Sequence, residues 1–242
     1  MPHRLKKYYP SKPKHDAVLT SYNIVCNAHK ACSAFLKQFE DIRRYRKAKG
    51  TPTDTEQDLL RAMLAFACAG LDSMSKQLVR DVLPELVDRD EGAAAMFFQR
   101  TKKALYKDNV LNVELLLRSI MTAAPRNILM SDLVSELTSG CLQSVDELFR
   151  VAAYFNIASK DLAANPNDLK RIFHVRNQIA HEMDMDFTQR NRSRRPRARD
   201  VMIDDVNVIF SVAKVFLEKT DNKLNEPNKS VNAYVSHRED AV

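Results

Sequence analysis

Tryptophan is absent from this chain of 242 residues, and glycine occurs only four times. Glycine-rich phosphate loops and the GxSxG turn of serine hydrolases both need closely spaced glycines, and the sequence contains neither pattern. These absences argue against a nucleotide-dependent enzyme and against a serine hydrolase. The remaining composition is rich in Ala, Leu, Met, Lys, Glu and Arg, which favours helices over sheets. The sequence therefore predicts an all-α protein.

Cysteine is also scarce and shows no metal-binding spacing. Cys26, Cys32, Cys68 and Cys141 form no CxxC pair, and no histidine lies at zinc-ligand spacing from them. We therefore expect reduced thiols, with no metal and no cofactor.

The most apolar run falls short of the roughly 20 residues that a bilayer requires, and no signal-peptide pattern precedes it. We expect a cytoplasmic protein that does not enter a membrane.

Patterning along the chain divides it into four segments. Residues 1–15 are basic and hold three prolines, which indicates a flexible arm. Apolar residues at three-and-four spacing predict a long helix over residues 16–50, an N-terminal extension to the main helical domain over residues 51–220. Residues 221–242 are polar, and we expect a frayed tail.

The motif with the most chemical content is Arg-Asn-Gln-Ile-Ala-His at residues 176–181, in a helix expected to start at Asn165-Pro166 and to end near Met185. At about 100° per residue, Arg176 falls in the middle of the apolar face of this helix. Burying a guanidinium against a core costs free energy unless an anion or a second subunit compensates its charge. An arginine paired within its own subunit is the structural alternative.

His181 lies about 140° from Arg176 on the same helical wheel, beside His174 and Asn177 on the polar face. The arginine and the histidine therefore do not converge on one straight helix. Either the helix ends or kinks between them, or two copies of the chain assemble the working site. A ribonuclease without a metal needs a group that moves protons near neutral pH and a cation that stabilises charge on phosphate. Histidine and arginine fit these roles.

At these residues the sequence resembles the HEPN superfamily, whose members carry an arginine and a histidine separated by four to six residues, often with Asn directly after the arginine. Glu182 stands where the most similar subgroup often has glycine. The resemblance implies a HEPN-like helical bundle and a homodimer with a composite active site. It also implies metal-independent endoribonuclease activity that leaves 2′,3′-cyclic phosphate and 5′-hydroxyl ends. Arg176, His181 and Asn177 would be the catalytic residues, with His174 as a supporting residue.

Asp72 is the one acid in the segment from Leu59 to Met74, which is apolar on nearly all sides and is expected to be a buried helix. HEPN-like domains often carry an acid in such an early helix. The resemblance therefore suggests that Asp72 supports Arg176 through charge-assisted hydrogen bonds. A position at the hydrated edge of the helix is the alternative.

Basic charge is concentrated in two segments. Residues 190–199 contain arginines and no acid, residues 1–14 add five further cations, and the rest of the chain is mildly acidic. Flexible arginine-rich segments bind phosphate backbones without sequence preference. We expect an RNA contact here, while a solvated loop and a localisation signal remain alternatives. The residues concerned are Arg190, Arg192, Arg194, Arg195, Arg197 and Arg199.

The primary hypothesis is a dimeric endoribonuclease in a toxin–antitoxin, phage-defence (antiviral) or stress-response system, with RNA as substrate and an antitoxin or regulatory protein as a further partner. The second is a non-catalytic helical dimer that binds RNA or protein. A third makes the amphipathic first helix a docking surface that regulates the domain.

Overall fold

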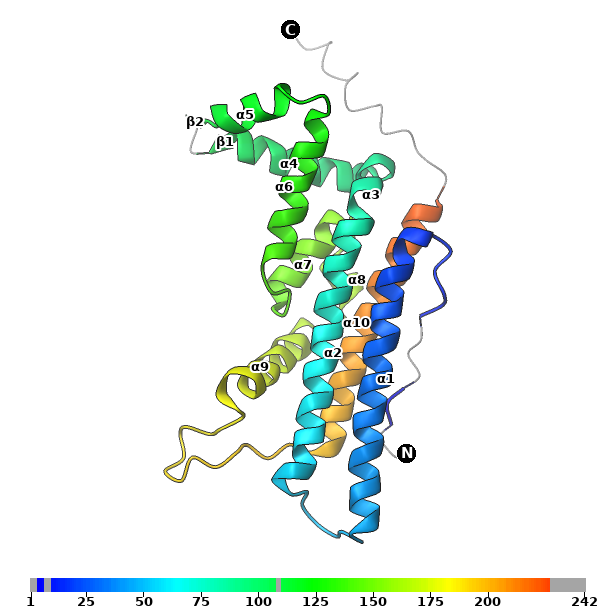
Figure 1. Ribbon diagram of the computed structural model, residues 1–242, viewed down its shortest axis with the longest axis vertical. Coiled ribbons are helices and arrows are strands. Elements are labelled where there is room, and N and C mark those ends of the chain that lie inside the picture. The colour runs from blue at the N-terminus through cyan, green and yellow to red at the C-terminus, as the bar shows by residue number, and fades with distance from the viewer. Residues whose placement is uncertain (1–3, 7–9, 108–109, 227–242) are drawn as a thin grey trace.

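The computed structural model describes residues 4–6, 10–107 and 110–226. Within these residues the chain forms ten helices and one short pair of strands (Figure 1). The all-α prediction is confirmed. In chain order the elements are α1 (Asp16–Tyr45), α2 (Asp54–Asp81), α3 (Leu83–Arg89), α4 (Glu91–Leu105), β1 (Tyr106–Lys107), β2 (Val110–Leu111), α5 (Val113–Ile120), α6 (Pro125–Ser139), α7 (Val145–Tyr154), α8 (Ser159–Leu162), α9 (Pro166–Glu182) and α10 (Arg199–Asn225).

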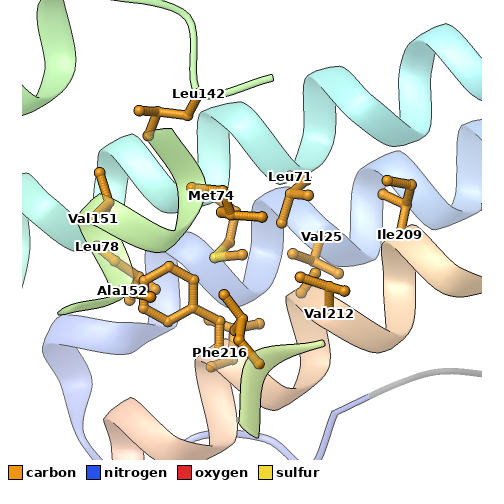
Figure 2. Close-up of a cluster of buried hydrophobic side chains, with 14 of the residues drawn as sticks. Val25, Leu71, Met74, Leu78, Leu142, Val151, Ala152, Ile209, Val212 and Phe216 are labelled. Atoms are coloured by element: carbon orange, nitrogen blue, oxygen red, sulfur yellow. The ribbon is translucent and has the colours of Figure 1, made fainter. Parts of the chain in front are cut away.

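The three longest helices, α1, α2 and α10, run side by side and form the centre of the molecule (Figure 1). Their facing side chains are almost wholly shielded from solvent and merge with residues of α7 and of the loop before it. Figure 2 shows this cluster, with Val25 from α1, Leu71 and Met74 from α2, Phe216 from α10 and Val151 from α7. Burial of these apolar side chains is the main term that stabilises the fold.

Helix α1 is an integral part of this core, which differs from the expected N-terminal extension. Val18, Val25, Cys32 and Phe39 repeat at helical spacing along α1, and each is buried. The helix also approaches α2 unusually closely, because a Cβ atom at Gly70 would lie 2.4 Å from the Cβ atom of Ala28. A separate role for α1 as an exposed docking helix is incompatible with this burial.

A second layer of shorter helices covers one side of α2. Helices α6 and α7 contact α2, and α4 packs against α3 and α7. Strands β1 and β2 pair antiparallel after α4, with Tyr106 opposite Leu111. In the described part of the chain, no helix has the length and apolar character needed to cross a bilayer.

The described residues near the two ends of the chain pack against the rest of the molecule, which differs from the expected flexible arm and frayed tail. The described residues of the expected flexible arm bond to α10: Lys6 N–H donates to Asn207 Oδ1 at 3.0 Å, and His15 N–H donates to Asp221 Oδ1 at 2.9 Å. Helix α10 continues to Asn225 and buries Leu224, so residues 221–225 are helical rather than frayed. The predictions for residues 1–3, 7–9 and 227–242 lie outside the described residues.

The close approach of α1 and α2 gives a first prediction. Gly70→Ala should lower the free energy of unfolding by about 1–2 kcal/mol. The 2.4 Å contact with Ala28 places the overpacking cost in the upper part of its usual range, at about 2–3 kcal/mol, and the gain in helix propensity offsets about 1 kcal/mol of it. Chemical denaturation measures the difference. Gly140→Ala is the matched control, since no atom lies within 4 Å of its added Cβ. The double variant Ala28→Gly/Gly70→Ala should regain part of the loss. Equal stability of Gly70→Ala and wild type would contradict the packing argument.

Candidate functional site

Helix α9 carries the motif, and local sequence determines where it begins and ends. Pro166 occupies the first turn, and the Asn165 side chain accepts a hydrogen bond from Asn167 N–H. The helix ends at Met183, which adopts the left-handed conformation with φ of 51°. The N–H groups of Met183 and Asp184 both bond back to Gln178 O, which satisfies a carbonyl group of the last helical turn. One face of α9 buries Leu169, Ile172 and Phe173 against the core.

Arg176 lies on this inward face, as predicted, and is partly buried. Its Nη1 donates to the Oδ1 of Asn177 at 3.0 Å, so the guanidinium is directed toward the exposed amide beside it. Buried Cys68 of α2 lies close enough that the arginine charge opposes the rise in its pKa to about 12, which burial causes. Among the described arginines that are not fully exposed, Arg176 alone has no carboxylate within 4.0 Å.

His174, Asn177 and His181 are all exposed on the outer face of α9. His181 lies in the last helical turn of α9. His174 Nε2 is 3.0 Å from Gln178 Nε2. Because Gln178 Oε1 accepts a hydrogen bond from Arg197, its Nε2 is the donor to the ring. His174 Nε2 is therefore the acceptor, and Nδ1 carries the proton of the neutral ring.

The two central motif residues stay on different sides of α9. The helix runs without a break from Pro166 to Glu182, so neither an end nor a change of element separates Arg176 from His181. At about 100° per residue, five residues leave their side chains roughly 140° apart. Arg176 brings its guanidinium to Asn177, whereas His181 points to solvent one turn further on. Within one chain, these residues do not face a common point.

The segment after α9 is held by a buried carboxylate. Asp184 is fully buried and accepts hydrogen bonds from Arg61 Nε at 2.7 Å and from Arg197 Nε at 2.9 Å, and Arg197 Nη2 forms a further bond to it. Arg61 belongs to α2, and its Nη2 also donates to Arg195 O at 2.9 Å. These bonds join the end of the motif helix to α2 and to the segment that leads into α10.

The expected pairing of Asp72 with Arg176 is wrong. Asp72 instead forms an ion pair with Lys76 at 2.9 Å, one turn along α2, and accepts a hydrogen bond from Leu142 N–H at 2.7 Å. No bond between Asp72 and Arg176 occurs in the described residues, where the Arg176 guanidinium donates to Asn177 Oδ1. The physical reason is that both carboxylate oxygens of Asp72 are already occupied, Oδ2 by Lys76 and Oδ1 by Leu142 N–H in the loop before α7.

Most arginines of residues 190–199, the arginine segment, form ion pairs with other parts of the chain, so the segment is not a free loop. Arg194, Arg195 and Arg199 pair with Asp58, Glu182 and Glu40, while Arg197 is held by Asp184. Burial alone would raise the pKa of Asp58, but hydrogen bonds from Arg194 and Arg61 hold it below its usual value. Arg190 and Arg192 are exposed, and neither has an ion pair with another described residue. Of the six arginines expected to bind RNA, these two retain uncompensated charge.

Sequence reasoning missed three charged residues that organise the site: Arg61, Asp184 and Asp205. Asp205 of α10 is buried and takes two hydrogen bonds from Arg171, which raise the pKa of that guanidinium. Arg61 did carry a visible signal, since it interrupts an apolar helix just as Arg176 does. Asp184 and Asp205 carried none, because their partners Arg61 and Arg171 lie far from them in the sequence.

Comparison with known proteins gave no relative: no family model, no curated protein and no solved structure matches the chain. Arguments about function therefore depend on the motif and on the geometry around it. In the described residues, no three histidine, cysteine or acidic side chains gather in a way that could hold a metal ion.

The Asp184 network gives a second prediction. Asp184→Asn should lower the free energy of unfolding by about 3–5 kcal/mol, because removing one partner of a buried ion pair leaves the other uncompensated. Thermal and denaturant unfolding measure the effect. Asp186→Asn is the matched control from the same loop, since the Asp186 carboxylate bonds only to neighbouring Thr188 and Gln189. A comparable loss in the two variants would remove the special role of Asp184.

Proposed function

We propose that this protein is a metal-independent endoribonuclease of HEPN type whose working site is shared between two copies of the chain. In this proposal, Arg176 stabilises negative charge on the scissile phosphate and Asn177 positions it. His181 moves the proton. The ribose 2′-hydroxyl attacks the adjacent phosphorus while the 5′-oxygen leaves, which yields a 2′,3′-cyclic phosphate and a 5′-hydroxyl. His181 acts as general base on the 2′-hydroxyl or as general acid on the leaving oxygen.

The observation that carries the proposal is the partly buried Arg176 without a carboxylate partner. Other arginines near α9 pair with carboxylates: the shielded Arg61 and Arg197 with Asp184, and the more exposed Arg171 with Asp205. The guanidinium is partly desolvated, and its hydrogen-bond partner is a neutral amide. Its positive charge is therefore not balanced by a nearby negative charge. A phosphate group would supply that charge, and guanidinium is well suited to bind it through two parallel hydrogen bonds.

The separation of Arg176 and His181 supports a site shared between two copies. On an unbroken helix the two side chains diverge, so a second motif is needed to bring a histidine to the arginine. Met183 and Phe187, which follow the motif directly, have 68 % and 60 % of their surface exposed. Large apolar side chains exposed beside polar ones are typical of contact surfaces. A two-fold contact at this end of α9 would cover them and would place the two motifs together.

The proposal extends to a biological setting. A nuclease without a metal requirement needs restraint in the cytoplasm, which fits a toxin–antitoxin, antiviral or stress-response role and a neutralising or regulatory protein partner. Expression of the isolated protein should then slow growth. The Asp184 network would serve this activity by fixing the position of α9, and the bond from Gln178 would orient His174 as a supporting residue beside the cleft.

Cleavage of RNA tests the proposal directly. Purified wild type in EDTA should cut total and defined RNAs, whereas His181→Ala and Arg176→Ala should each lose at least about 100-fold in rate, the usual effect of removing a general acid–base or a charge-stabilising group. Mapping of the ends should find cyclic phosphate and 5′-hydroxyl. Lys160→Ala, which removes an exposed cation of α8, is the control. Circular dichroism should be unchanged in all three variants, because each altered side chain lies on a helix surface.

Three outcomes would contradict the mechanism. Cleavage that persists in His181→Ala would remove the histidine from the reaction. Cleavage that stops in EDTA would replace the proposed chemistry with a metal-dependent one. Intact RNA after incubation with wild type would instead support the second candidate, a non-catalytic RNA-binding dimer.

That second candidate is favoured by the exposed, unpaired Arg190 and Arg192. Replacing both with Gln should weaken RNA binding uniformly across sequences and reduce the slope of log K against log salt by about 1.5–2, because each phosphate contact contributes roughly 0.7–0.9. Fluorescence anisotropy over a salt series measures the slope. Arg80→Gln/Arg118→Gln is the matched control, since both arginines are exposed and neither forms an ion pair within the described chain. An unchanged slope would place RNA elsewhere on the molecule.

A further inference from the structure

A second candidate site lies away from the motif, in an open pocket of about 690 Å³ between α4, α6 and α7. In Figure 1 these helices form the layer beside α2, distinct from α9. Met96 and Ala104 supply apolar wall, together with the ring of Tyr154. Ligand pockets typically occupy 300–1,000 Å³ and combine apolar walls with a few polar groups. The size therefore suits a small organic molecule.

The pocket carries an excess of positive charge. Arg100, Lys103 and Arg150 line it, and Glu136 is the one acid among the lining residues. Both oxygens of Glu136 are occupied: Oε2 accepts from Arg100 Nε and Nη2 at 3.1 and 3.0 Å, and Oε1 accepts from Arg150 Nη1 at 3.0 Å. The carboxylate is thus shared by two guanidinium groups, and Arg150 also pairs with Glu147 at 2.7 Å, just outside the lining. The excess positive charge therefore comes from Lys103, which has no ion pair with any residue that the structure describes.

Two groups at the pocket have hydrogen-bonding capacity that the protein does not use. Arg100 Nη1 is enclosed and has no partner in the described chain. Burial and the nearby Glu136 charge raise the pKa of the Tyr154 hydroxyl, which therefore stays protonated and able to donate near neutral pH. Arg100, Lys103 and Tyr154 all line the pocket and each carries a hydrogen-bond donor. An oxygen-rich anion would satisfy them, and an enclosed donor without an acceptor is itself unfavourable.

We propose that this pocket binds a phosphomonoester that carries an apolar or aromatic body. The phosphate oxygens accept from Lys103, Arg100 and Tyr154, while the body contacts Met96, Ala104 and the Tyr154 ring. A dianionic phosphate matches the positive excess better than a monoanionic carboxylate does, and its three terminal oxygens match donors from three residues. This site is independent of the motif on α9 and does not rest on the proposed nuclease activity.

Calorimetric titration of the full chain tests the assignment with adenosine 5′-monophosphate and phenyl phosphate. Both should bind wild type more tightly than inorganic phosphate, adenosine or benzoate. Lys103→Gln should weaken binding by about tenfold, the effect expected for losing one charged hydrogen bond. Lys102→Gln is the matched control, because it removes the same charge from the neighbouring position on α4, outside the pocket lining. Its affinity should equal that of wild type.

The other outcomes overturn the proposal. Absence of binding, or equal weakening by Lys103→Gln and Lys102→Gln, would show that the pocket is not a specific anion site. Benzoate binding as tightly as phenyl phosphate would exclude the phosphate assignment, and inorganic phosphate binding as tightly would exclude the apolar contacts. Loss of binding in Arg176→Ala but not in Lys103→Gln would place the phosphate at α9. None of these results depends on RNA cleavage, so failure of this site is distinguishable from failure of the nuclease.

Discussion

The buried carboxylate of Asp184 is the constraint on which the arrangement of the candidate active site depends. It is fully buried between Arg61 of α2 and Arg197 of the segment before α10, so it joins three parts of the chain at one point. Asp184 adopts φ of 59°, a left-handed conformation that aspartate tolerates better than most residues. The two arginines offset the cost of burying its charge only while both remain in place. Through these bonds the end of α9 has a defined position relative to the core.

Because the position of α9 is fixed, the motif residues on its two sides face different surroundings. The inward side of α9 packs on the core and holds Arg176 in partial burial, whereas the outward side presents Asn177, His174 and His181. Hydrogen bonds continue from Asp184 through Arg197 and Gln178 to His174, so the buried network also orients an exposed imidazole. A rigid helix with a shielded cation on one side and a histidine on the other is suited to a site completed by a second copy. Under the proposed function, a single chain offers only half of that site.

Local patterns predicted the helices well, whereas distant pairings could not be predicted. The start of α9 at Pro166 is fixed by neighbours a few residues away, and it is confirmed. The burial of Arg176 on its helix face is confirmed for the same reason. The bond from Arg61 to Asp184 spans 123 positions and depends on how α2 packs against a loop. The predictions for Asp72 and for the arginine segment failed for the same reason. The residues around a charged side chain do not reveal which distant carboxylate or amide the tertiary fold will place next to it.

The central claim is that Arg176 of one copy works with His181 of the other, and a mixed dimer tests it most directly. Arg176→Ala and His181→Ala chains, co-expressed with different affinity tags, can be purified as a pair that contains one of each. If the site is shared, this dimer retains one complete site of two, so it should show about half of the wild-type cleavage rate although each parent is inactive. A mixed dimer as inactive as its parents would contradict the shared site.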